Sequence, residues 1–149
     1  MSNTRKALPW IVTGIALVLV VTVVVGEEAT DEDLKKAALT PPVVPAEAKQ
    51  QENPFAWNAD ARKKGALYFS SQCVMCHGAD GRGTGDLVER LSLTMPDFTD
   101  PEMQKKWTDG AMFYVINAGH GAMPGQKDRF DPEIKWGMVN YVRSFANDD

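Results

Sequence analysis

The first strongly apolar segment of the chain runs from Leu8 to Val25 without a charged residue. A run of about 18 apolar residues is long enough for a membrane-spanning helix, and it exceeds the roughly 7 to 15 residues of a signal-peptide core. We therefore predict an N-terminal membrane anchor over residues 1–26. The same pattern leaves open a signal that is cleaved after Gly26.

The charges on the two sides of this apolar run differ in sign. Arg5 and Lys6 precede the run, whereas residues 27–33 contain a cluster of carboxylates. Because basic flanks stay on the cytoplasmic side, we predict a single-pass protein of the inner (cytoplasmic) membrane. Its C-terminal part would then lie on the periplasmic or outer side.

Residues 27–54 are acidic and then proline-rich, with few large apolar side chains to bury. This composition predicts a linker rather than a folded unit. The sequence leaves three roles for this linker open. It could be a flexible tether that lets the domain move between partners, a spacer that holds the domain away from the lipid surface, or a segment packed along a partner subunit.

Helical periodicity dominates the remainder, and no alternating pattern of useful length appears, so we predict an all-α domain over residues 55–149. Helices are expected to begin near Asn58, Asp100, Thr108 and Asp131, each a residue type that caps helices. The last helix has the clearest apolar stripe: Ile134, Met138, Tyr141, Val142 and Phe145.

Charge and cysteine content narrow the functional classes. The net charge of −4 and the pI near 5.2 argue against a nucleic-acid partner, because no basic stripe is present. The negative net charge favours a protein partner with a basic docking surface. Only two cysteines occur, Cys73 and Cys76, and they are too close together to close a stabilising loop. They indicate a chemical site.

These cysteines belong to a Cys-x-x-Cys-His motif, Cys73–His77, which is the attachment sequence of c-type haem. We predict one covalent haem c bound through Cys73 and Cys76, with His77 as an iron ligand. Two alternatives remain open. A zinc site would need His120 as its fourth ligand, and a thiol-disulfide site should follow a strand rather than a helix.

A second axial ligand is expected from the loop Gly119–Gly125, where Met123 precedes a proline and glycines allow close approach to a haem. We predict Met123 as this ligand and keep His120 as its rival, a loop histidine being the other interpretation. The remaining methionines are terminal, inside the attachment loop, on helix faces, or too soon after His77: Met1, Met75, Met112, Met138, Met95 and Met103.

The segment from Asn58 to Phe145 resembles a class I cytochrome c. Gly65 and Phe69 match the family's glycine and aromatic on the N-terminal helix, which pack on the C-terminal helix, here against Met138 and Tyr141. Other matching stretches resemble monohaem subunits of bacterial respiratory complexes, including alternative complex III: Cys76–Gly83, Met95–Thr99, Trp107–Gly110 and Gly121–Pro124.

The resemblance implies three further haem-binding residues. Pro96 would offer its backbone carbonyl to the second ring nitrogen of His77, unless it is an ordinary loop proline. Trp107 would donate its indole N–H to a haem propionate, unless it is only a packed aromatic side chain. Arg82 would approach a propionate, or else remain a solvated loop charge.

These features together predict a one-electron carrier and not an enzyme, because ligation by His77 and Met123 would saturate the iron. The carrier would be a fixed or tethered relay in a membrane respiratory or photosynthetic chain, and its partners would be redox proteins. The alternative function is a membrane-anchored thiol-disulfide oxidoreductase that uses Cys73 and Cys76.

Overall fold

The computed structural model describes Thr30 and residues 41–146. The predicted anchor over residues 1–26 and most of the acidic part of the linker lie outside the described residues. Within the described part of the chain, no helix combines the length and the apolar character needed to cross a membrane.

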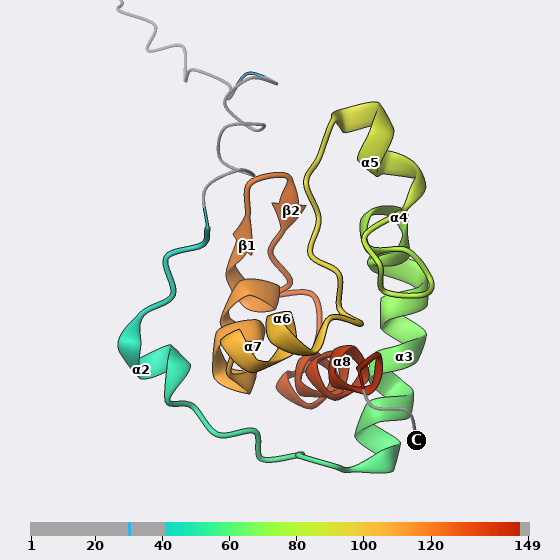
Figure 1. Cartoon of the computed structure of the whole chain (residues 1–149). Coiled ribbons are helices and arrows are strands. Elements are labelled where there is room, and N and C mark those ends of the chain that lie inside the picture. The colour runs from blue at the N-terminus through green and yellow to red at the C-terminus, as the bar shows by residue number, and fades with distance from the viewer. Residues whose placement is uncertain (1–29, 31–40, 147–149) are drawn as a thin grey trace, which may run out of the picture.

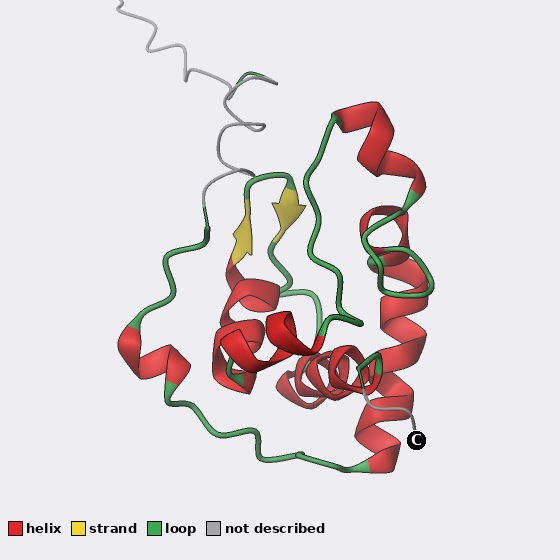
Figure 2. Cartoon of the chain, viewed as in Figure 1, coloured by secondary structure: helices red, strands yellow, loops and turns green. Residues whose placement is uncertain are grey.

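Most of the described chain is helical, as predicted, with one short hairpin (Figures 1 and 2). The two longest helices are far apart in the chain, and shorter elements connect them. In chain order the elements are α2 (Ala46–Lys49), α3 (Ala59–Gln72), α4 (Val74–His77), α5 (Asp86–Leu91), α6 (Pro101–Lys106), α7 (Asp109–Ala118), β1 (Gly119–His120), β2 (Met123–Pro124) and α8 (Pro132–Ser144).

The two longest helices, α3 and α8, cross at a point where neither carries a side chain. A Cβ atom added to Gly65 would lie only 2.0 Å from the carbonyl oxygen of Gly137. One turn later, the rings of Phe69 and Tyr141 meet edge to face with centroids 5.2 Å apart. The predicted packing of Gly65 and Phe69 on the C-terminal helix is therefore confirmed, whereas the role of Gly137 was not anticipated.

Local capping explains where three helices begin. The side chains of Asn58, Asp100 and Thr108 accept hydrogen bonds from backbone N–H groups in the first turns of α3, α6 and α7, at 2.9, 2.9 and 3.1 Å. The start of α8 is also confirmed, but the predicted cap is wrong. Asp131 makes no side-chain capping bond, and Pro132 supplies the helical φ at the first position.

The end of the predicted linker packs onto the domain. Val44 is only 9% exposed, and a Cβ added to Gly110 on α7 would lie 2.1 Å from the carbonyl oxygen of Ala48 on α2. The amide of Asn53 donates to Asp109 at 3.2 Å and to Asn140 at 2.8 Å. Apart from the small side chain of Val44, these contacts use backbone and polar side-chain groups, so a search for large apolar side chains does not detect them.

The α3–α8 crossing predicts the outcome of one substitution. Gly65→Ala places a methyl group against the backbone of α8, and we expect a loss of at least about 2 kcal/mol of unfolding free energy. Urea denaturation measures this loss. Leu67→Ala, on the same helix but 64% exposed, is the control, and equal stability of the two variants would contradict the proposed crossing.

Candidate haem-binding site

The attachment motif forms one helical turn that follows directly on α3. Cys73 caps α3 through a bond from its N–H to the carbonyl of Phe69 at 2.9 Å, and the N–H of His77 then donates to the carbonyl of Cys73 at 2.9 Å. Gly78, with φ of 75°, ends the turn. As predicted, both cysteines and the histidine therefore lie on a single turn, α4 and its cap.

Both cysteines are free thiols in a partly buried environment. Burial, assisted by the neighbouring Cys76, raises the pKa of Cys73 to about 11, and burial also raises the pKa of Cys76. Both groups are therefore protonated near neutral pH. This is the opposite of the low thiol pKa that thiol-disulfide exchange requires.

The imidazole of His77 is buried and neutral. It is 9% exposed and stacks on the ring of Phe98, with centroids 4.7 Å apart and an interplanar angle of 20°. Burial lowers the pKa of His77 to about 4, and its Nδ1 has no hydrogen-bond partner. A neutral ring keeps a lone pair for a metal, so this histidine fits the role of an iron ligand.

The loop that carries Pro96 folds against the turn after His77. The N–H of Phe98 donates to the carbonyl of Gly81 at 2.8 Å, and a Cβ on Gly83 would lie 3.0 Å from the carbonyl oxygen of Pro96. This places the Pro96 segment beside the turn that follows the histidine. The expected hydrogen bond from His77 to Pro96 is not formed in this structure.

Met123 lies on a β-hairpin that the sequence analysis did not predict. Residues His120 and Met123 pair directly across the two strands, so their side chains lie on the same face. The turn between them begins with Gly121 at φ of 54°, while Ala122 has no positive φ, a pattern typical of a II′ turn. Strands of only two residues are too short to show the alternation of apolar and polar residues by which a strand is recognised in a sequence.

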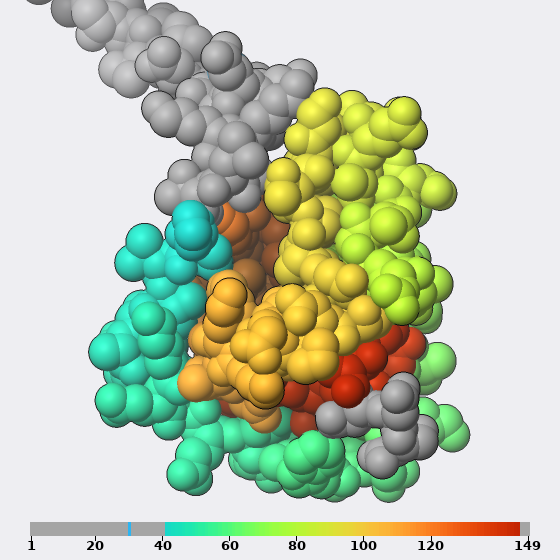
Figure 3. Space-filling model, viewed as in Figure 1, coloured from blue at the N-terminus to red at the C-terminus, as the bar shows by residue number. Residues whose placement is uncertain are grey.

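The hairpin and the attachment turn belong to different parts of the domain. In Figure 1 the extended segment after α5 runs between the hairpin on one side and α4 on the other. The space-filling view shows a recess between this yellow segment and the teal N-terminal segment, with hairpin atoms at its back (Figure 3).

Trp107 and Arg82 have other partners in this structure. Trp107 is partly buried against the apolar core, and its carbonyl accepts a bond from Arg143 at 2.6 Å. The exposed guanidinium of Arg82 lies 3.8 Å from the carboxylates of Asp80 and Asp97. The predicted contacts of both residues with haem propionates remain predictions.

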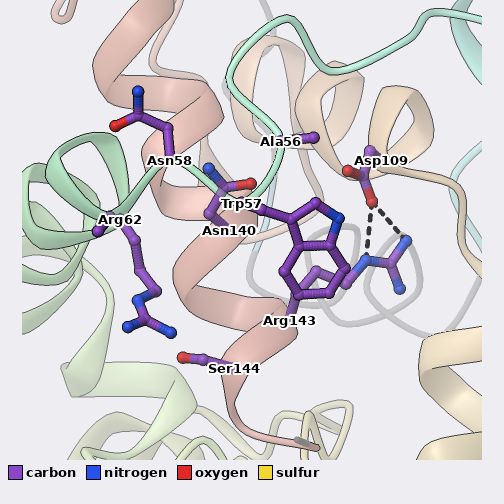
Figure 4. A pocket seen from close by; sticks show the side chains of 9 residues that line it. Ala56, Trp57, Asn58, Arg62, Asp109, Asn140, Arg143 and Ser144 are labelled. Carbon is purple, nitrogen blue, oxygen red and sulfur yellow. Dashed lines mark hydrogen bonds and ion pairs between the residues drawn. The ribbon is translucent and has the colours of Figure 1, made fainter. Parts of the chain in front are cut away.

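Arg143 on α8 organises the segment around Trp107. Its guanidinium donates to Asp109 at 2.8 Å and to the backbone carbonyl of Gln104 at 2.6 Å, so it ties α8 to both α6 and α7. Figure 4 shows Arg143 reaching Asp109 beside the indole of Trp57. A cavity of about 250 Å³ is lined by these side chains and lies apart from the attachment turn.

Comparison with known proteins identifies the family. The model of the family "Cytochrome C oxidase, cbb3-type, subunit III" matches residues 59–142, which is more than half of the chain. The chain belongs to this family. It is a c-type cytochrome and an electron-transfer protein, so these two predictions are confirmed. The matching family is named for a subunit of a cbb3-type oxidase, a respiratory complex of the general kind for which the sequence analysis gave alternative complex III as an example.

The chain is also similar to two known proteins. The chain is 31% identical over 84 residues to the Cbb3-type cytochrome c oxidase subunit FixP of Bradyrhizobium diazoefficiens. The match covers 56% of this chain and 27% of that relative, so the chain spans about a quarter of the relative's length. The solved structure of the KustC0563 c-type cytochrome has a TM-score of 0.49 and 35% identity, with 54% of this chain and 95% of that chain covered.

The Arg143 contacts predict a measurable coupling. Arg143→Met removes the ion pair with Asp109, which keeps only its bond from Asn53, and the guanidinium bonds to two backbone carbonyls, so we expect a loss of about 2–4 kcal/mol in urea denaturation. Asp109→Asn in the same background should add little, because the pair acts as a unit. Lys64→Met breaks an exposed pair with Glu133 and should cost less than about 1 kcal/mol. Equal losses in Arg143→Met and Lys64→Met would contradict this account.

Proposed function

We propose that this protein is a one-electron carrier with one haem c attached to Cys73 and Cys76, and with His77 and Met123 as axial iron ligands. The observation that carries the proposal is the turn Cys73–His77, which presents two unlinked thiols and a buried, neutral imidazole. When bound, the haem iron supplies the redox chemistry by alternating between its ferric and ferrous states.

The protein's own groups would hold the cofactor in a fixed orientation. The Nε2 atom of His77 would bind iron, while Nδ1, which has no partner among the described residues, would donate to the Pro96 carbonyl. The ring of Phe98 already packs on this imidazole and restricts its rotation. The thioether of Met123 would be the second iron ligand, and its soft sulfur would favour the reduced state.

Two polar side chains would hold the haem propionates. The indole N–H of Trp107 is one donor, and Arg143 fixes its backbone. Arg82 is the second, because its present carboxylate contacts are long and exposed and can be exchanged at little cost.

The carrier would act as a relay subunit of a membrane-bound respiratory oxidase complex. The family name and the FixP likeness support an oxidase complex, and the apolar run over residues 8–25 with its flanking charges supports an N-terminal anchor. The haem domain would then lie on the periplasmic side and exchange electrons with redox protein partners.

Two observations weigh against the competing functions. The raised pKa values of Cys73 and Cys76 disfavour a thiol-disulfide oxidoreductase. Over residues 41–146, no three His, Cys, Asp or Glu side chains gather into a group that would bind a metal, so the zinc site with His120 is not formed.

Covalent haem is the first property to test. The full chain, expressed with a c-type haem maturation system, should retain haem staining after denaturing electrophoresis, because thioether bonds survive unfolding. The variant Cys73→Ala/Cys76→Ala should lose the stain completely. Wild-type protein without stain would overturn the proposed function, and so would an unchanged stain in the double variant.

The second axial ligand is tested by absorption spectroscopy of the ferric protein. Met123→Ala should abolish the methionine-to-iron charge-transfer band and lower the reduction potential. Met75→Leu is the matched control, because Met75 lies in the attachment turn but is 45% exposed, and it should keep the band. If the wild type lacks the band and His120→Ala changes its spectrum, His120 is the ligand and the assignment of Met123 is wrong.

A further inference from the structure

We propose that Lys135 is a positioning residue for the second axial ligand, because its ammonium group fixes the strap Met123–Lys127 to the end of α7. The inference rests on the proposed function, in which Met123 binds the haem iron. It extends that function by naming a buried residue, remote in sequence from both ligands, that keeps the methionine in place.

Lys135 is unusual because it is a buried cation without a carboxylate. It is 4% exposed, and its Nζ donates to the Asn117 side-chain oxygen at 2.7 Å and to the Lys127 carbonyl at 3.0 Å. Nζ also lies 5.7 Å from the centroid of the Phe113 ring. Among the described residues it forms no ion pair. Burying a charge is costly, so these neutral partners must hold it firmly.

The two hydrogen-bond acceptors of Lys135 lie at the two ends of one loop. Asn117 is in the last turn of α7, just before the hairpin, and Lys127 is the last residue of the strap. One ammonium group on α8 therefore clamps both ends of the segment that projects Met123. Its cation also lies at the C-terminal end of α7, where the helix dipole stabilises positive charge.

Backbone bonds complete the clamp. The N–H of Gln126 donates to the Ile116 carbonyl at 2.9 Å, and the N–H of Lys127 donates to the Asn117 carbonyl at 3.1 Å. These bonds satisfy carbonyl groups that α7 leaves free at its end. The strap is therefore attached to α7 and α8 by three hydrogen bonds. Among the hydrogen bonds of residues 41–146, only the one from the Lys135 ammonium joins Lys127, the end of the strap, to a side chain of α8.

A positioning role and a merely structural role make different predictions. If Lys135 holds the strap, its loss should weaken the bond between Met123 and iron, and an external ligand should then compete more easily for the iron. If Lys135 only fills space, Lys135→Met should leave that competition unchanged, because methionine retains the apolar length of the lysine stem.

The experiment is a titration of the ferric full-length holoprotein with imidazole. The disappearance of the methionine-to-iron absorption band measures how much imidazole has replaced the methionine. We expect Lys135→Met and Asn117→Ala each to bind imidazole about tenfold more tightly than the wild type, since each removes a hydrogen bond to a charged donor. The double variant should bind about as tightly as Lys135→Met alone, because that substitution already breaks the bond to Asn117 as well as the bond to the Lys127 carbonyl. The control Lys105→Met, at an exposed lysine on α6, should match the wild type.

The outcomes separate the inference from the proposed function. A wild type without covalent haem or without the methionine band overturns the function itself. A wild type with both, together with Lys135→Met and Asn117→Ala variants that bind imidazole like Lys105→Met, overturns only the inference. If Lys135→Met does not fold, Asn117→Ala decides in the same way, because it leaves the backbone bonds of α7 unchanged.

Discussion

The close backbone contact of α3 and α8 at Gly65 and Gly137 is the constraint on which the rest of the domain depends. It fixes the direction of α3, whose end passes directly into the attachment turn Cys73–His77. It also fixes α8, whose side chains Lys135 and Arg143 reach the hairpin strap and the Trp107 segment. A single contact between two glycines thus determines where both halves of the candidate site lie, because neither helix can shift without displacing the groups that it carries.

The polar groups of the domain serve orientation rather than acid-base chemistry. His77 is neutral because burial lowers its pKa, and the two cysteines are protonated because burial raises theirs. Lys135 and Arg143 donate hydrogen bonds to backbone carbonyls and so hold neighbouring segments in place. Such a site suits a cofactor that changes its charge by one electron while the surrounding protein stays rigid, since a rigid and poorly hydrated site reorganises little during transfer.

Much of the candidate site could be predicted from the sequence because its signals are local. The spacing of Cys73–His77, the caps at Asn58 and Thr108, and the proline that opens α8 each depend on neighbours within one helical turn. The resemblance to class I cytochromes c added the pairing of α3 with α8, and the family assignment supports that resemblance. The membrane anchor remains a prediction of the sequence, since it lies outside the described residues.

The tertiary structure decided whatever depends on contacts between distant segments. No local sequence pattern reveals three of these features: the pairing of His120 with Met123 across the hairpin, the packing of α2 on α7, and the burial of Lys135. A lysine on an amphipathic helix is expected to face water. Lys135 is buried instead, because the fold brings the Asn117 side chain and the Lys127 carbonyl together around its ammonium group as hydrogen-bond acceptors. The sequence by itself determined the chemistry of the site, because ligand types follow from residue types, while the fold decided which residues orient those ligands, because orientation arises only from packing.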